Sequence, residues 1–180
     1  MQHTREWCFH GYMAIEVRRL VSRDADQLFG LRHRALVEEP FAFLASPGDD
    51  LSSSPEAVRH QLSLRSDGAV FGAFDTDELF GMVSVSRDRP IKADHRVCVW
   101  GVFVDRKYRR RGVALDLLNT ALNYARQLDG VSTAYLSVSE KTPEAKRLYE
   151  SAGFSVWGVE PDCIRVDGES AREYHLSLSI

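Results

Sequence analysis

The sequence predicts a single domain of the α/β class (mixed α+β), with helices on both faces of a central sheet. Three observations support this fold class. The 180 residues, 44% of them apolar and 27% charged, suffice for one core without disulfides or metals. Strand and helix patterns follow one another in the order β-α-α-β-β-β-α-β-α-β-β, which indicates a sheet covered by helices. The chain shows no internal repeat, low-complexity tract or linker.

The amino-terminal half is predicted to contain two helices and four strands. The first helix begins at Ser22, as its N-cap, and ends at Pro40. The second helix begins at Ser54, again as N-cap, with Pro55 at its first position. The predicted strands cover residues 15–20, 70–74, 79–86 and 96–104. Gly101, in the middle of the last of these strands, indicates a β-bulge or a close approach of the backbone.

The carboxy-terminal half is predicted to continue with two helices and three strands. Apolar residues recur at helical spacing over residues 112–128. The short apolar segment 134–138 is typical of a buried strand. Thr142 and Pro143 open another helix, which Gly153 closes. The final strands are expected at 154–159 and 172–180.

Composition and spacing exclude several other classes of protein. The three cysteines, Cys8, Cys98 and Cys163, lie far apart and predict neither a disulfide framework nor a zinc site. The acidic residues and histidines also lack metal-ligand spacing, so no metal is expected. No apolar run approaches the ~18 residues of a membrane span. Residues 1–13 lack the apolar segment of a signal peptide. We therefore expect a loose extension over 1–13, a domain over 14–180 and a cytoplasmic location.

A basic turn joins the strand at 96–104 to the following helix, over Arg109-Arg110-Arg111-Gly112-Val113-Ala114. The first N–H groups of a helix have no partner within the helix and carry the positive end of its dipole. They form a natural site for phosphate, and Gly112 and Ala114 would let a phosphate approach the backbone. The sequence contains neither G-x-x-x-x-G-K-[ST] nor G-x-G-x-x-G, so a P-loop and a Rossmann dinucleotide site are not supported.

Two segments resemble a known family. Arg109-x-x-Gly112-x-Ala114 matches the R/Q-x-x-G-x-G/A motif of the GNAT N-acetyltransferases. The later segment Ala145-x-x-Leu148-Tyr149-x-x-x-Gly153-Phe154 is similar to the same family at the expected separation. The resemblance covers residues 14–180 and is strongest over 97–154. It implies a twisted, mostly antiparallel central sheet and acetyl-CoA as the acyl donor.

The resemblance also implies roles for individual residues. The pyrophosphate of the donor would lie on the backbone amides of 110–114. The pantetheine arm would pair with the strand backbone at Val102 and Val104, like an added strand. Tyr149 matches a tyrosine near the sulfur, and its hydroxyl would protonate the departing thiolate. The expected cofactor-binding residues are Val102, Val104, Arg109, Arg110, Arg111, Gly112, Val113, Ala114, Thr142 and Tyr149.

The sequence departs from the family pattern at three positions. Thr142 stands where the family often has asparagine; its hydroxyl would cap the helix and contact the cofactor. Arg110 replaces a glycine that is common after the first arginine of the motif. Some members carry a catalytic glutamate six residues before the position of Val104, and Cys98 stands there instead, so the resemblance supplies no base. The candidates for the base are His95, Glu140, Glu38 and a water molecule.

The activity that the resemblance implies is direct transfer of acetyl to a primary amine of a small molecule or peptide. Two other hypotheses stay open: a non-catalytic acyl-CoA-binding module and a nucleic-acid-binding basic patch. The net charge of −3 disfavours the patch, and we expect neither a nucleic acid nor a membrane as partner. A homodimer is plausible for the family. The acceptor pocket is expected between the first two helices, the loop 41–53 and the last strands.

Overall fold

The structure, a computed structural model, describes residues 15–64 and 67–180. The predicted extension over 1–13 and the predicted start of the domain at 14 lie outside these residues. Within them a seven-stranded sheet has the order β1-β2-β3-β4-β5-β7-β6. Neighbouring strands are antiparallel except β4 and β5, which are parallel. The strands are β1 (Ile15–Arg19), β2 (Gly68–Asp75), β3 (Glu78–Arg87), β4 (Arg96–Val104), β5 (Thr133–Ser139), β6 (Ser155–Val166) and β7 (Glu169–Ser179).

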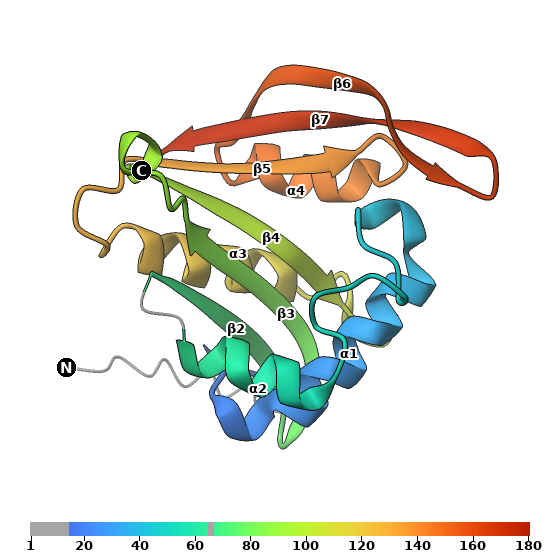
Figure 1. Cartoon of the computed structure of the whole chain (residues 1–180), viewed down its shortest axis with the longest axis vertical. Helices are drawn as coiled ribbons and strands as arrows, with labels where there is room; N and C mark the ends of the chain where they lie inside the picture. Colours follow the sequence, from blue (N-terminus) through green and yellow to red (C-terminus); the bar gives the residue numbers. More distant parts are fainter. Residues whose placement is uncertain (1–14, 65–66) are drawn as a thin grey trace.

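In the part of the chain that the structure describes, four α-helices cover the two faces of the sheet. They are α1 (Ala25–Glu38), α2 (Pro55–Leu64), α3 (Val113–Ala125) and α4 (Pro143–Ser151). α1 and α2 lie on one face, and α3 and α4 on the other (Figure 1). Leu31 of α1 packs in one buried cluster with Phe74 and Met82 of the sheet. Leu117 of α3 packs in the other cluster with Phe80. The order and class of the elements are as the sequence predicts.

The first helix starts later than predicted. Ser22 lies in a 3-10 turn (Ser22–Asp24), and α1 begins at Ala25. Asp24, which is only 4% exposed, is the residue at the N-cap position. Its carboxylate accepts a hydrogen bond from the N–H of Val21 (2.9 Å) and two from Arg18 (both 2.8 Å). The predicted cap at Ser22 is wrong because the turn that Asp24 stabilises delays the helix.

Two further boundaries differ from the prediction. α3 ends at Ala125 rather than at residue 128, because the chain turns back towards β5 through Gly130, whose φ is 73°. The final hairpin is longer than predicted, because β6 continues to Val166 and β7 already begins at Glu169. Pro161, a residue that sheets tolerate only at edges or bulges, lies within β6 in an irregularity between Glu160 and Ile164, after which pairing resumes.

The strand β4 contains a bulge and then separates from β5. The register with β3 passes from Ser84–Trp100 to Met82–Phe103, so Gly101 and Val102 together face one residue of β3. Gly101 has a φ of 66°, and the predicted bulge is thereby confirmed. β4 pairs with β5 only at its first three residues, 96–98. Beyond them the two strands diverge (Figure 1).

The divergence leaves the end of β4 with an open edge. The N–H of Asp105 donates to the carbonyl of Phe80 (2.9 Å), which makes Gly81 and Val104 a non-hydrogen-bonded pair. The backbone N–H and C=O of Val104 therefore point away from β3, towards the opening beside β5.

Candidate active site

The loop between β4 and α3 is fixed by a buried tyrosine. Tyr108 ends a 3-10 turn (Arg106–Tyr108), and its ring stacks on Phe80 at a centroid distance of 3.8 Å. Its hydroxyl donates to a carboxylate oxygen of Asp75 (2.8 Å). Gly112, with a φ of 82°, then directs the chain into α3. A Cβ added at Gly112 would meet no heavy atom within 4 Å, so the backbone here faces open space. The sequence predicts an anion site at this start of a helix, where N–H groups have no partner within the helix.

A cleft of about 630 Å³ joins this loop to the open edge of β4 and to α4. It brings together nearly every residue that the sequence assigns to the cofactor. The members among its lining are Val102, Val104, Arg109, Arg110, Gly112, Val113, Ala114, Thr142 and Tyr149. Arg111 is the exception and does not line the cleft. Its guanidinium lies over the ring of Tyr108, 5.5 Å from the centroid.

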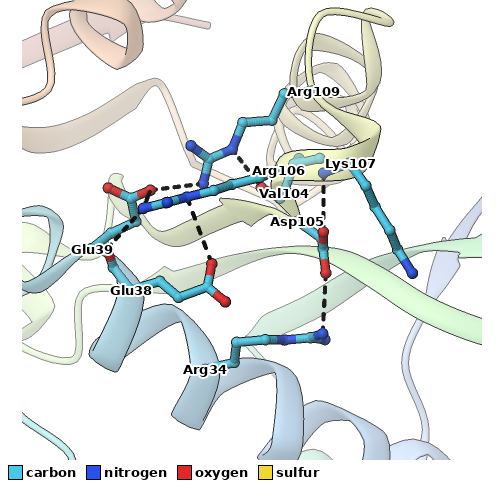
Figure 2. Close-up of polar contacts among 8 residues, drawn as sticks. All are labelled: Arg34, Glu38, Glu39, Val104, Asp105, Arg106, Lys107 and Arg109. Carbon is cyan, nitrogen blue, oxygen red and sulfur yellow. Dashed lines mark hydrogen bonds and ion pairs between the residues drawn. The ribbon is translucent and has the colours of Figure 1, made fainter.

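Hydrogen bonds and ion pairs of Arg34, Arg106 and Arg109 tie the loop to the end of α1, as Figure 2 shows. Nη2 of Arg109 and Nη2 of Arg106 both lie near Oε1 of Glu39, at 3.0 and 3.2 Å. Nε of Arg109 donates to the carbonyl of Val104 (2.8 Å), one of the groups on the open edge. On the other side of the turn, Arg34 of α1 pairs with Asp105 (3.1 Å). We call the contacts of Glu39 with Arg106 and Arg109 the Glu39 clasp.

Two residues of α4 reach the opposite wall of the cleft. Tyr149 is 7% exposed, and its ring meets Phe154 edge-on at 6.2 Å. Burial raises the pKa of Tyr149 well above its usual value, so the phenol stays protonated at neutral pH. Thr142 is at the N-cap position but does not cap the helix. Its hydroxyl instead donates to the carbonyl of Ser139 (3.1 Å), so the predicted capping role is wrong.

The candidate bases lie outside this lining. His95 is exposed before the first residue of β4, at the far end of the strand from the loop. The carboxylate of Glu140 accepts hydrogen bonds from Nε (2.7 Å) and the backbone N–H (3.1 Å) of Arg172. These two hydrogen bonds lower the pKa of the Glu140 carboxyl. Glu38 lies 3.8 Å from Nε of Arg106, and its neighbour Glu39 lines the cleft instead.

Cys98 occupies the position of the family glutamate, on β4 before the bulge. Burial raises the pKa of its thiol to about 11, so the thiol is neutral at physiological pH. Beside it in the register lies Tyr135, whose hydroxyl donates to Asp88 (2.7 Å).

Three charged residues of the cleft, Glu39, Glu144 and Arg147, are absent from the predicted site. The contacts of Glu39 arise from tertiary packing, which the sequence does not reveal. Arg147 of α4 also lines the cleft, together with Glu144 and Leu148. These three stand at helical spacing beside Tyr149, so that spacing was a signal which would have found them.

Two negative findings concern the residues that the structure describes. Among 15–64 and 67–180, no group of three or more His, Cys, Asp or Glu side chains is arranged to hold a metal ion. No helix in the same ranges combines the length and the apolar character needed to cross a membrane.

Comparisons with known proteins agree with this geometry. Residues 33–154 match the acetyltransferase (GNAT) family. Human N-acetyltransferase 8 is 32% identical over 99 residues, which are 54% of this chain and 43% of that protein; the match thus spans less than half of this relative. The structure of a GNAT acetyltransferase from Streptococcus pneumoniae has a TM-score of 0.84 at 20% identity, covering 93% of this chain and 99% of that one.

A second solved structure contains acetyl-CoA. A putative acetyltransferase from Salmonella typhimurium, solved with acetyl-CoA, has a TM-score of 0.79 at 17% identity over 92% of this chain and 94% of that one. At these identities the two solved structures establish the fold, and the family match, which covers more than half of the chain, establishes descent. The chain belongs to the GNAT family of acetyltransferases.

Proposed function

We propose that the protein is an N-acetyltransferase that moves acetyl from acetyl-CoA directly to a primary amine of a small molecule or peptide. The observation that carries the proposal is the cleft itself. One continuous surface presents the amino-terminal end of α3, the open edge of β4 and the buried hydroxyl-bearing Tyr149. These are an anion site, a template for an extended arm and a proton donor, in the order in which acetyl-CoA presents phosphate, pantetheine and thioester.

The residues of the cleft fit such a donor. The space over Gly112 leaves room for a phosphate against the backbone. Arg109 and Arg110 supply positive charge beside it, and Arg147 does so from α4. The outward-facing backbone of Val104 suits pairing with an amide of the arm. When bound, acetyl-CoA would supply a thioester carbon that is open to attack by nitrogen.

The chain's own groups would act on the two ends of the bond that breaks. The amine nitrogen forms a bond to the carbonyl carbon, the C–S bond breaks, and the proton lost by nitrogen balances the proton gained by sulfur. An N–H of β4 near Val104 would stabilise the negative charge that develops on the carbonyl oxygen. The hydroxyl of Tyr149 would donate to the sulfur. Because burial raises the pKa of Tyr149, its hydroxyl still carries its proton at neutral pH, when the thiolate departs.

The Tyr149→Phe variant tests this role. We expect kcat to fall about 10²-fold, with the KM for acetyl-CoA little changed because the ring remains. Steady-state release of free thiol from acetyl-CoA measures both constants. Tyr174→Phe is the matched control, since Tyr174 lies on β7 and does not line the cleft. An unchanged kcat in Tyr149→Phe across neutral pH would contradict the role.

One observation favours a second function. Because Cys98 replaces the glutamate of some members and is neutral at physiological pH, the fold is also compatible with a non-catalytic acyl-CoA-binding module. A panel of amines in the thiol-release assay separates the two. Turnover above the rate of thioester hydrolysis supports the enzyme. Stabilisation by acetyl-CoA without turnover of any amine supports the module, and absence of stabilisation contradicts both.

A further inference from the structure

A second cavity, of about 970 Å³, opens on the face of the sheet that carries α1 and α2. Its walls come from the loop between these helices and from the adjoining ends of β3 and β4. The cavity and the 630 Å³ cleft that we assign to the donor lie near one another along β4, because Trp100 lines the cavity and Val102, two residues further on, lines the cleft. An acceptor in this cavity would therefore face the acyl group across the bulge.

Arg32 of α1 lies at this junction and is held in one orientation. It is 9% exposed. Its Nε and Nη2 donate to the two carboxylate oxygens of Asp50, at 3.1 and 3.0 Å. The guanidinium also lies over the rings of Phe43 and Trp100, 5.1 and 5.9 Å from their centroids. A planar group held by two hydrogen bonds and two rings is well suited to recognise a ligand of fixed geometry.

One end of this guanidinium is left unsatisfied. Nη1 of Arg32 is buried and has no hydrogen-bond partner among the described residues. It faces the bulge, because a Cβ built on Gly101 would lie 3.6 Å from it. A small space of about 20 Å³, lined by Arg32, Ser84 and Gly101 among others, adjoins it. That space has room for one oxygen atom of a ligand, and it shares Arg32, Ser52 and Trp100 with the larger cavity, where the rest of the ligand would lie. A buried charged donor of this kind calls for an acceptor oxygen.

We propose that Nη1 of Arg32 binds a carboxylate of the acetyl acceptor, which makes the acceptor an amino acid or another small amine with a carboxylate close to its amino group. The proposal rests on the proposed function. Gly101 and Val102 are neighbours in the chain, so their Cα atoms are about 3.8 Å apart. The acyl group proposed to lie along 102–104 is thus next to the bulge, and an amine that attacks it from the cavity would direct a carboxylate one or two carbons away towards Nη1.

Most of the acidic groups of the cavity are already paired with arginines. Asp50, Asp88 and Asp94 lie 3.0, 2.6 and 3.9 Å from arginine nitrogens, whereas Asp49 and Asp67 also line the cavity. Asp50 already accepts hydrogen bonds from Nε and Nη2 of Arg32. The carboxylate of the ligand would therefore be the second carboxylate that contacts this guanidinium. An amino acid carries no net charge as a zwitterion and adds none to the cavity. A charge-assisted pair in a partly buried place discriminates strongly against a neutral amide.

The wild-type protein provides the first test. Thiol release would be measured with a series of α-amino acids, their carboxamides and methyl esters, and the corresponding amines without a carboxylate. We expect kcat/KM for the acids to exceed that for the amides by about 10-fold or more. Equal values for acids and amides would overturn the proposal, as would a preference for diamines, which would fit the aspartates of the cavity instead.

A conservative variant provides the second test. Arg32→Lys keeps the charge and a partner for Asp50 but loses the planar fork. We expect the KM for acids to rise about 10-fold, with the KM for amides unchanged, so that the acid-to-amide ratio falls towards 1. Arg59→Lys is the matched control, since Arg59 pairs with Asp26 (3.3 Å) on the outside of the same two helices. A ratio unchanged in Arg32→Lys would overturn the proposal.

Thermal stabilisation by acetyl-CoA distinguishes a failure of the proposed function from a failure of the role proposed for Arg32. If the wild-type protein gains no stability from acetyl-CoA, the proposed function fails. If it gains stability and turns over amines, but shows no preference for a carboxylate, only the role of Arg32 fails. Should Arg32→Lys not fold, the comparison of acids with amides on the wild-type protein still decides.

Discussion

Arg110 and Gly112 have positive φ values of 62° and 82°, on either side of Arg111. Glycine adopts this conformation freely, whereas a side chain makes it cost about 1 kcal/mol or more. The glycine that the family commonly has at the position of Arg110 therefore has a physical reason, which is the shape of the turn. Successive N–H groups in such a turn point into one concave space, which binds anions. Arg110 keeps this shape at some cost in stability and adds a positive charge.

The Gly112→Ala variant separates the shape of the turn from the binding of phosphate. We expect the free energy of unfolding to fall by about 1 kcal/mol, because the added Cβ strains the backbone and touches nothing. The affinity for acetyl-CoA should fall at least about 10-fold, because the methyl group occupies the space over the backbone. Urea unfolding measures the change in the free energy of unfolding, and titration calorimetry measures the affinity for acetyl-CoA.

Gly168→Ala is the matched control for this change. Gly168 also has a positive φ, of 85°, and open space around an added Cβ, but it lies in the turn between β6 and β7. It should lose a similar free energy of unfolding and keep the affinity of the wild-type protein. Equal affinities in the two variants would show that phosphate does not lie over Gly112.

Asp24 predicts a pH dependence of stability. Hydrogen bonds from Arg18 lower the pKa of Asp24 in the folded state below the value of about 3.9 expected in the unfolded chain. Its contribution to stability is therefore complete above about pH 4 and is lost as the pH falls through the folded-state pKa. We expect Asp24→Asn to be less stable than the wild-type protein at pH 7, and the difference to shrink under acid. Urea unfolding from pH 7 downwards measures it.

The control for Asp24 is a neighbour on the same helix. Asp26, whose side chain is 71% exposed, forms only a surface pair with Arg59. Asp26→Asn should follow the wild-type curve within about 0.5 kcal/mol at each pH. A stability difference for Asp24→Asn that stays constant into acid would refute the linkage.

At the level of elements, the Glu39 clasp joins α1 to the turn before α3 (Figure 2). It holds the guanidinium groups of Arg106 and Arg109 against a carboxylate at the mouth of the donor cleft. We expect an anionic donor to compete with Glu39 for these groups. Phe43, shortly after the end of α1, lines the same cleft and lies under Arg32. If donor and acceptor bind as proposed, α1 and the segment after it contact both.

The Glu39→Gln variant measures that competition. We expect it to bind acetyl-CoA about 2- to 5-fold more tightly, because exposed ion pairs of this kind contribute only about 0.2–1 kcal/mol. The gain should decrease as salt is added, because salt screens the charges. Glu78→Gln is the control, since Glu78 pairs with Lys107 of the same turn (2.9 Å) outside the cleft. Weaker binding by Glu39→Gln would mean that Glu39 orients the arginines rather than competing for them.

The sequence predicts those elements best whose signals are local. The turn from Arg109 to Ala114 is read directly because the glycine, the basic residues and the following helix are contiguous. Thr142 and Ser22 are less predictable, because a hydroxyl chooses among several nearby backbone partners and the choice depends on the turn. The second half of β6 is difficult to predict because it follows Pro161. A proline fits a strand only at a sheet edge or a bulge, and the sequence does not reveal that β6 is an edge strand.

Contacts between distant segments explain what the sequence does not predict of the site. Arg32 and Asp50 stand 18 residues apart, and Asp50 lies in a loop without periodicity. Neither residue signals a role until folding places the loop against α1. The same holds for Glu39 and Arg109, which are 70 residues apart. Contiguous motifs therefore predict the turn at 109–114. The surroundings of Arg32 and Glu39 depend on contacts between distant segments, which no motif reveals.

At the scale of the whole molecule, the domain consists of two parts that meet along a short seam. β1 to β4 form one part of the sheet, and β5, β7 and β6 form the other. The direct seam is the three-residue pairing of β4 with β5. Leu117 of α3 and Tyr149 of α4 belong to one buried cluster, so packing beneath the sheet holds the parts together where hydrogen bonds do not. The cleft opens where the seam ends.

A donor bound in the cleft would extend this seam, and that predicts how stability changes upon binding. At a concentration of 100 times its Kd, acetyl-CoA should stabilise the protein by about 2.7 kcal/mol. For a chain of this size, that free energy raises Tm by roughly 5–10 °C. Hydrogen exchange should slow most at residues 102–104 of β4 and in the first turn of α4, because these segments lie on the two sides of the opening. A fragment of CoA that ends at the pyrophosphate should protect the start of α3 but leave 102–104 unchanged. If the fragment and acetyl-CoA protected the same amides equally, the arm would not lie along β4, and the open edge beside the bulge would need another explanation.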